Sequence, residues 1–142
     1  MTTTLDARLR ETFAAIADVL IPNAEGMPAA SEVKVHETML DHIVALRPDL
    51  REDLLRGLTK AAGRNATEAA NDLNKTDAAA LSAIGLVASA GYYMTPRIRE
   101  LIGYPGQESR PDSDPDAVPE YVKNGMLQQV IDRGPIFKPT PK

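Results

Sequence analysis

Apolar residues recur at helical spacing through the first hundred positions of the chain. In the first set the successive spacings are four, four, three and four residues, and its members are Leu5, Leu9, Phe13, Ile16 and Leu20. This spacing places them on one face of a helix. Thr4 is the expected N-cap of that helix, and Pro22 is expected to end it.

The same pattern predicts five further helices in this part of the chain. They cover about Val33–Leu46, Pro48 to near Gly63, Ala66–Leu73, a segment that follows the cap Thr76, and Pro96–Ile102. The positions expected to face inward are Val35, Met39, Ile43, Leu46, Leu50, Leu54, Leu55, Leu58, Leu81, Ile84, Val87 and Ala88. Small residues surround the inward line of the fifth helix and permit close packing, so we expect that helix to be central.

The pattern changes after Gln107. Residues 108–119 form a polar, proline-rich linker, Glu120–Arg133 carries a weak helical signal, and Gly134–Lys142 is expected to be extended. No alternating strand pattern is present. The sequence therefore predicts an all-α fold, with a helical domain of about five to six helices at 1–107 and an extended, proline-rich, partner-binding arm at 108–142.

Composition excludes several function classes. The chain of 142 residues has a net charge of −4 and no basic block, so nucleic acid is not an expected partner. No apolar run reaches the roughly 20 residues of a membrane span, so direct membrane insertion is not expected either. Cys is absent, which removes thiolate and iron–sulfur chemistry. No export signal is visible at the N-terminus, so we expect a cytoplasmic location by default, or a periplasmic one if a partner carries the signal.

Catalytic chemistry has few candidates. His36 and His42 are the only histidines, and six residues turn a helix by about 600°, so the two rings face apart. No serine lies in a nucleophile motif, and the glycines form no phosphate or dinucleotide loop. We therefore predict no catalytic, cofactor-binding or metal-binding residue in this chain.

Aromatic residues concentrate in one stretch, Gly91–Gln107, which holds three of the four tyrosines. Thr95 and Pro96 have the form of a helix start, with Thr as N-cap and Pro at the first position. A glycine-rich turn at 103–106 then ends that helix. Tyr92 and Tyr93 can close the core or contact a partner. We expect one to point inward and the other outward, with Tyr104 at the edge where the arm departs.

The arm gives a stronger argument for a partner. Its large apolar residues are separated by prolines and polar residues, and they include Tyr121, Met126, Leu127, Ile136 and Phe137. Such a segment cannot form a core alone, and segments of this kind either stay disordered or fold against a partner.

Three pieces of the chain resemble the small, or gamma, subunit (subunit 3) of gluconate 2-dehydrogenase and related sugar dehydrogenases. The opening helix ends in an Ile-Pro step at Pro22, and the loop that follows reads Gly-Met-Pro-Ala-Ala-Ser from Gly26. The specific piece is Gly-Tyr-Tyr-Met-Thr-Pro from Gly91, followed by Leu-Ile-Gly-Tyr-Pro-Gly from Leu101. The likeness spans about residues 10–107. The closing segment 119–140 is also similar to the tail of subunits that accompany glycoside 3-dehydrogenases.

This resemblance implies a helical, non-catalytic accessory subunit. Such subunits bind a large FAD-containing subunit of the glucose–methanol–choline class, which oxidises a sugar and passes electrons to a cytochrome or another acceptor. They aid its folding, stability or export. Many carry a twin-arginine signal, which this sequence lacks. The expected interface residues are Tyr92, Tyr93, Thr95, Pro96, Tyr104, Pro105, Gly106, Tyr121, Ile136 and Phe137.

Two alternatives stay open at this point. One is a helical protein that self-associates through the arm, without a flavoprotein partner. The other is a small cofactor-free enzyme, for which His36, His42 and neighbouring carboxylates are the only candidate groups.

Overall fold

The structure, a computed structural model, describes residues 5–108 and 118–137. Within these ranges most residues are helical and none belongs to a strand, so the predicted all-α class is confirmed. The chain divides into two compact units, Met1–Gly106 and Gln107–Lys142, and each is described by itself.

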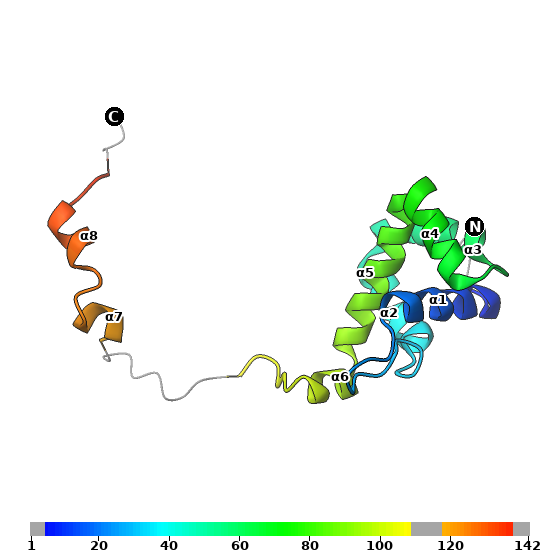
Figure 1. The fold of residues 1–142 in the computed structure, drawn as a ribbon, viewed down its shortest axis with the longest axis horizontal. Coiled ribbons are helices and arrows are strands. Elements are labelled where there is room, and N and C mark those ends of the chain that lie inside the picture. Colours follow the sequence, from blue (N-terminus) through cyan, green and yellow to red (C-terminus); the bar gives the residue numbers. More distant parts are fainter. Residues whose placement is uncertain (1–4, 109–117, 138–142) are drawn as a thin grey trace. The chain divides into compact units, whose positions relative to one another are not determined.

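The first unit is a bundle of short helices with one long helix, α5 (Figure 1). In chain order its elements are α1 (Ala7–Leu20), the π-helical segment η1 (Val35–Met39), α2 (Leu40–Leu46), the 3₁₀ segment η2 (Pro48–Leu50), α3 (Arg51–Ala61), α4 (Ala66–Thr76), α5 (Ala78–Met94) and α6 (Pro96–Leu101).

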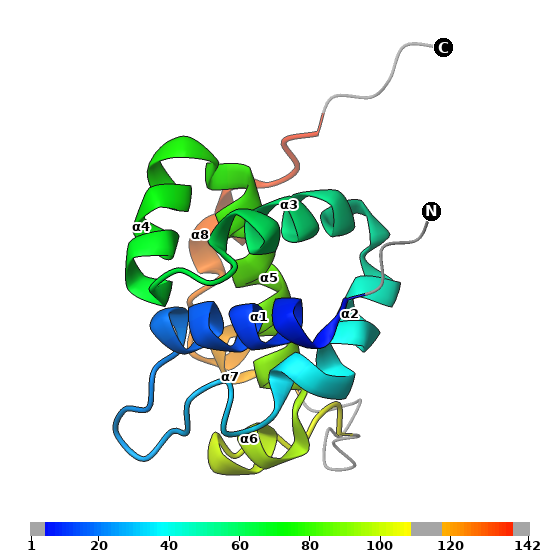
Figure 2. The ribbon, with the colours of Figure 1, turned by 90° about the vertical axis from the view of Figure 1, so that its right-hand side faces the viewer.

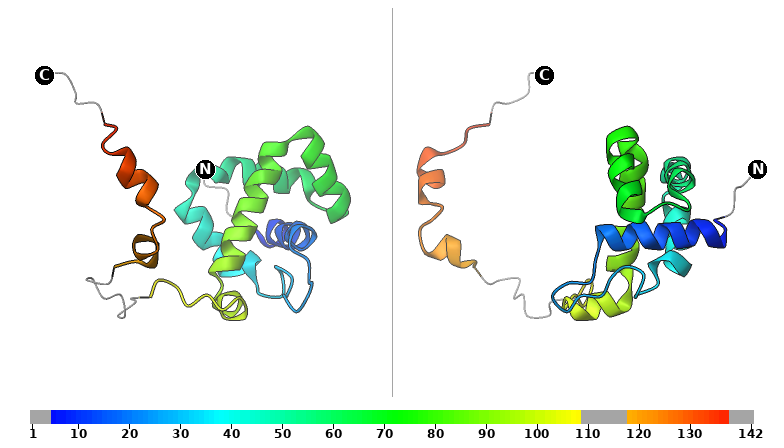
Figure 3. Two further views of the ribbon diagram at one scale, coloured as in Figure 1. Left: turned by 60° about the vertical axis from the view of Figure 1, so that its left-hand side comes forward. Right: turned by 45° about the vertical axis from the view of Figure 1, so that its right-hand side comes forward.

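Helix α5 is the centre of this unit, as the small residues along it predict. It contacts α1, α2, α3, α4, α6 and η1. Helix α1 crosses it in Figure 2, and both views of Figure 3 show α4 near its start and α6 at its end. Small residues make the approach close: a Cβ on Gly57 of α3 would lie 3.0 Å from the Cβ of Ala80.

The core is mostly aliphatic and contains no charged side chain among the described residues. Its largest fully buried members come from every α-helix of this unit, and they are Phe13, Ile16, Leu40, Leu54, Leu58, Leu73, Ile84 and Ile98. Burial of such side chains stabilises a fold by about 1.5–3 kcal/mol each.

Helix α1 begins later than expected. Its N-cap is Asp6, whose Oδ1 accepts a hydrogen bond from the Leu9 N–H at 2.8 Å. The predicted cap, Thr4, lies outside the described residues. Asp6 is the better choice because its carboxylate reaches the third N–H of the helix and also favours the positive end of the helix dipole.

The helix predicted from Val33 to Leu46 is interrupted. Lys34 has a left-handed backbone, with φ of 59°, so the chain turns just before η1 instead of entering a helix at Val33. Glu37 has non-helical angles within η1. Arg10 of α1 supports this irregular backbone, since its Nη1 donates to the carbonyls of His36 and Glu37, each at 3.2 Å.

Two residues predicted to face inward are exposed. Leu20 and Leu46 are 40% and 59% exposed, and each is the last residue of its helix, α1 and α2. Spacing alone identifies a face of a helix, but it does not determine whether the last residue on that face is covered by another element.

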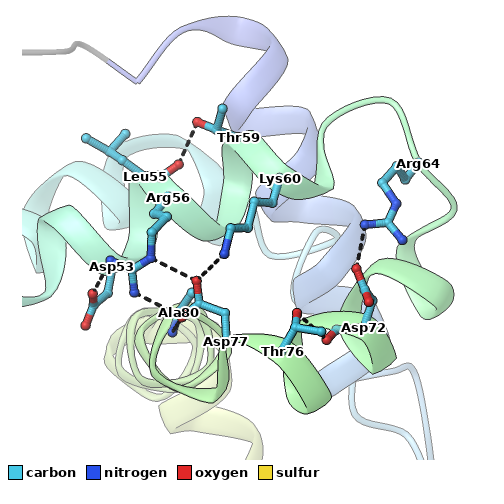
Figure 4. Close-up of polar contacts among 10 residues, drawn as sticks. All are labelled: Asp53, Leu55, Arg56, Thr59, Lys60, Arg64, Asp72, Thr76, Asp77 and Ala80. Carbon is cyan, nitrogen blue, oxygen red and sulfur yellow. Dashed lines mark hydrogen bonds and ion pairs between the residues drawn. The ribbon is translucent and has the colours of Figure 1, made fainter.

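Helix α5 is capped by Asp77, while Thr76, the predicted cap, is the last residue of α4. The Asp77 carboxylate accepts from the Ala80 N–H at 3.3 Å, from Arg56 Nε at 2.8 Å and from Lys60 Nζ at 2.6 Å. Figure 4 shows Arg56 and Lys60 of α3 converging on Asp77 at the start of α5. The two cations hold the pKa of the Asp77 carboxyl well below its usual range.

The second unit contains two short helices, α7 (Glu120–Lys123) and α8 (Gln128–Arg133), where a single helix from Glu120 to Arg133 was predicted. Gly125 separates them because it adopts a left-handed backbone, with φ of 79°. None of residues 118–137 is buried. The predicted extended tail begins at Gly134, and its residues 138–142, like 109–117 of the predicted linker, lie outside the described ranges.

Candidate functional site

Tyr92 and Tyr93 face opposite ways, as the sequence predicted. Tyr92 is 2% exposed, and its hydroxyl donates to the Pro28 carbonyl at 2.6 Å. Burial raises the pKa of the Tyr92 hydroxyl. Tyr93 is 57% exposed and meets the Tyr92 ring edge-on, with the ring centres 5.4 Å apart. Tyr92 therefore belongs to the core and is removed from the candidate contact residues, whereas Tyr93 remains one of them.

The segment Thr95–Pro96 turns the chain from α5 into α6. Thr95 is the N-cap residue by its extended backbone, but its side chain does not cap α6. The Thr95 hydroxyl donates instead to the Gly91 carbonyl at 2.8 Å, so it satisfies the end of α5. Pro96 occupies the first turn of α6, as expected, and its side chain is exposed.

The turn after α6 is folded against Arg99. Gly103 has a φ of 65°, and the Tyr104 N–H donates to the Arg99 carbonyl at 2.8 Å, which ends the helix. The Arg99 guanidinium lies over the Tyr104 ring, 5.4 Å from its centre. A Cβ on Gly106 would lie 2.8 Å from Arg99 Nη2, so only glycine fits here without displacing the guanidinium.

This arrangement makes a surface hollow of about 480 Å³ at the end of the first unit. Its lining residues come from α6 and the turn, and they are Pro96, Arg99, Glu100, Gly103, Tyr104 and Pro105. We name this set the α6 hollow. Tyr104 is 55% exposed beside it. An open hollow with a ring, two prolines and one charge of each sign can hold an apolar side chain of a partner.

The sequence did not predict a role for Arg99. The available signal was Gly106, seven residues after Arg99, because a glycine in the turn leaves room for the guanidinium. Arg97 is exposed, as a surface residue would be.

A second hollow, of about 470 Å³, lies between the end of α1, the following loop and α5. Sequence analysis did not predict it. Its lining residues are Leu20, Ile21, Pro22, Ala24, Glu25, Met27, Ser89, Tyr92 and Tyr93. The loop is fixed by Asp18, which accepts from the Ser31 N–H at 2.8 Å and from the Ser31 hydroxyl at 2.6 Å.

The remaining predicted interface residues belong to the second unit. Tyr121, Ile136 and Phe137 are 51%, 69% and 77% exposed. The structure thus brings Pro96, Tyr104 and Pro105 together at the α6 hollow, with Gly106 next to its Arg99. The other three predicted residues belong to the second unit.

The histidines do not form a site with other ligands. In the described part of the chain no group of three or more His, Cys, Asp or Glu side chains is placed to hold a metal ion. His42 is exposed, and the Nδ1 atom of His36 is buried without a hydrogen-bond partner. No helix within the described ranges is long and apolar enough to cross a bilayer.

The sequence matches no protein-family model, and comparisons with curated proteins and with solved structures found no significant match. The functional interpretation therefore depends on the motif residues and on the surfaces described above.

Proposed function

We propose that this chain is the non-catalytic small subunit of a dehydrogenase complex, and that it binds and stabilises a large FAD-dependent subunit of the glucose–methanol–choline class. The partner oxidises a sugar, sugar acid or glycoside at its own flavin, and passes electrons to a cytochrome or another acceptor. The small subunit assists the folding or export of that partner.

The exposed apolar side chains of the arm carry the proposal. Eight large apolar residues of this unit are exposed, namely Val118, Tyr121, Val122, Met126, Val130, Ile131, Ile136 and Phe137. Two helices of four and six residues cannot bury them against each other. When a large partner binds along this segment, it covers these apolar side chains. The free energy of their burial offsets the entropy that the segment loses on becoming ordered.

The α6 hollow supports a second contact on the helical unit. It is formed by the motif that carries the family resemblance, from Gly91 to Gly106. Tyr104 is pre-ordered by Arg99, so little rotamer entropy is lost when a partner covers it. Rigid aromatic side chains of this kind are frequent anchors in interfaces.

The identity of the partner comes from the resemblance, and one experiment tests it. The chain is co-expressed with a large FAD-dependent dehydrogenase subunit of this class and purified through a tag on the small chain. We expect a flavin-containing complex with sugar dehydrogenase activity, and a colourless, inactive small chain when it is expressed alone.

The control expresses the flavoprotein alone and measures its yield, FAD content and activity. If it folds, retains FAD and turns over at the same rate without the small chain, the proposed role is wrong. A Tyr104→Ala variant should weaken the complex, whereas Tyr93→Ala tests whether the exposed ring beside the second hollow contributes independently.

A further inference from the structure

The helices of the first unit cover only one face of α5. Opposite its buried residues runs a row of exposed ones with successive spacings of three, four, three and four. The members are Ala79, Ser82, Leu86, Ser89 and Tyr93, and we name this row the α5 seam. A 3-4 spacing is the pattern with which one helix packs lengthwise on another. The row extends over about 21 Å, at a rise of about 1.5 Å per residue.

The α5 seam carries no charge, and its two large members, Leu86 and Tyr93, alternate with the small residues Ala79, Ser82 and Ser89. No Asp, Glu, Lys or Arg occurs anywhere in α5, whereas every other helix of the described residues contains at least one. Leu86 and Tyr93 are 49% and 57% exposed. Leu20 extends the patch from α1, because its Cδ1 would lie 3.8 Å from a Cβ on Gly85. An uncharged row with exposed Leu86, Tyr93 and Leu20, on an otherwise charged surface, indicates a binding face.

We propose that the α5 seam binds the α5 seam of a second copy of this chain, with the two helices antiparallel. The dimer uses neither the arm nor the α6 hollow, the two surfaces that carry the proposed flavoprotein contact, and of the predicted interface residues it uses Tyr93 alone.

Size and charge both favour a second copy. In the antiparallel register Ser82 faces Tyr93 of the other copy, and Leu86 faces its Ser89, so a large side chain meets a small one in each layer. Alternating sizes let facing helices interdigitate. An uncharged face also favours a partner face without charges, because a charged side chain buried against it would have no ion-pair partner. The α5 helix of another copy meets this requirement over the full length of the seam.

The first test measures the mass of the full chain by light scattering over a dilution series. We expect a concentration-dependent dimer, which added salt leaves intact or strengthens because each chain carries a net charge of −4. Leu86→Glu should abolish the dimer. The matched control is Leu46→Glu, at another exposed leucine, on α2, and it should leave the dimer unchanged while circular dichroism confirms folding of both variants.

The second test uses the absence of native cysteine. A Leu86→Cys chain mixed with a Ser89→Cys chain should form a disulfide-linked pair under mild oxidation, faster than either variant alone. Asn71→Cys, on the exposed side of α4, replaces one partner in the control and should not cross-link. Faster cross-linking of Leu86→Cys with itself would indicate a parallel pair and overturn the proposal.

A monomer throughout the dilution series would also overturn it. If the wild-type chain is monomeric while Leu86→Glu loses the flavoprotein, the seam belongs to the heteromeric interface instead. The proposed function is measured separately, by flavin that co-purifies with the small chain, so the failure of one proposal is distinguishable from that of the other.

Discussion

Gly91 marks the closest approach between the central helix and the π-helical segment. A Cβ at this position would lie 2.6 Å from Cγ1 of Val35, which is fully buried. The Val35 side chain cannot move away freely, because Val35 belongs to the irregular backbone that Arg10 holds. We therefore interpret Gly91, the first residue of the tyrosine motif, as a packing residue.

Replacement of Gly91 by Ala should destabilise the protein. The added methyl group must displace Val35, and overpacking of this kind costs about 1–3 kcal/mol. The measurement is the free energy of unfolding from denaturant titration. The control is Gly85→Ala, whose Cβ would meet only Leu20 Cδ1 at 3.8 Å. Gly85→Ala should be more stable than the wild-type protein by up to about 1 kcal/mol, because Ala has a higher helix propensity than Gly. Equal stability of the two variants would contradict this account.

Tyr92 connects α5 to a carbonyl 64 residues earlier in the chain. Tyr92→Phe keeps the ring but leaves the Pro28 carbonyl without this donor, and a lost buried hydrogen bond costs about 1–3 kcal/mol. Thermal and denaturant unfolding should both report the loss. Tyr93→Phe, which changes an exposed hydroxyl, should leave stability unchanged. A stable Tyr92→Phe protein would show that the hydrogen bond contributes little.

At the scale of helices, Asp77 joins α3 to α5 through two cations and one backbone N–H. The pKa of its carboxyl is depressed in the folded state, so its pairing stabilises the fold above the pKa of the unfolded chain. That contribution is lost as the pH falls toward the lower, folded-state value.

Asp77→Asn should therefore flatten the acid side of the stability profile. Asn retains the capping geometry but cannot carry the charge, so the variant separates the two roles. Between about pH 5 and about pH 2 the wild-type free energy of unfolding should fall more steeply than that of the variant. Denaturant midpoints at several pH values measure both curves. Parallel curves would show that the ion pairs with Arg56 and Lys60 do not determine acid stability.

The helices differ in how well the sequence predicted them. Regular spacing identified α1 and α5, because local periodicity determines which face is apolar. The interruption at η1 was not predictable in this way, since its backbone carbonyls are bound by Arg10, a side chain from the distant helix α1. Thr76 was an equally acceptable cap by residue type. Asp77 takes that position because Arg56 and Lys60 of α3 stabilise its carboxylate there.

The candidate site shows the same division. Adjacent tyrosines must point differently on a helix, which the sequence predicted. Which of them is buried depends on Pro28, whose position follows from the folded loop. The stacking of Arg99 on Tyr104 likewise requires the backbone of Gly106 beneath the guanidinium. Residue types alone predicted contact residues, while their grouping into the α6 hollow needed the fold.

At the scale of the whole molecule, the two units differ in how they satisfy their apolar residues. The first unit buries them around α5, and α5 itself still leaves a seam exposed. The second unit buries none of its described residues, although it has two helices. One chain therefore offers a pre-formed surface and a segment that gains a core only from a partner. Such a combination suits an accessory subunit, which needs a stable body and an adaptable contact.

The arm should contribute to the complex through its most exposed apolar residues. Phe137→Asp places a charge at a side chain that is 77% exposed, so folding of the isolated chain should be unchanged. Binding of the flavoprotein should weaken by tenfold or more, if Phe137 is buried on association like other aromatic anchors (about 1.4 kcal/mol per factor of ten). Titration of the purified subunits measures the dissociation constant.

Gln129→Asp is the matched control, because it adds the same charge to the polar side of α8. It should change the dissociation constant only slightly. Hydrogen exchange provides a second readout: amides of 118–137 should exchange quickly in the free chain, since short exposed helices open easily, and slowly in the complex. Protection of the arm in the free chain, or equal binding by both variants, would assign the contact to the helical unit and leave the arm without this role.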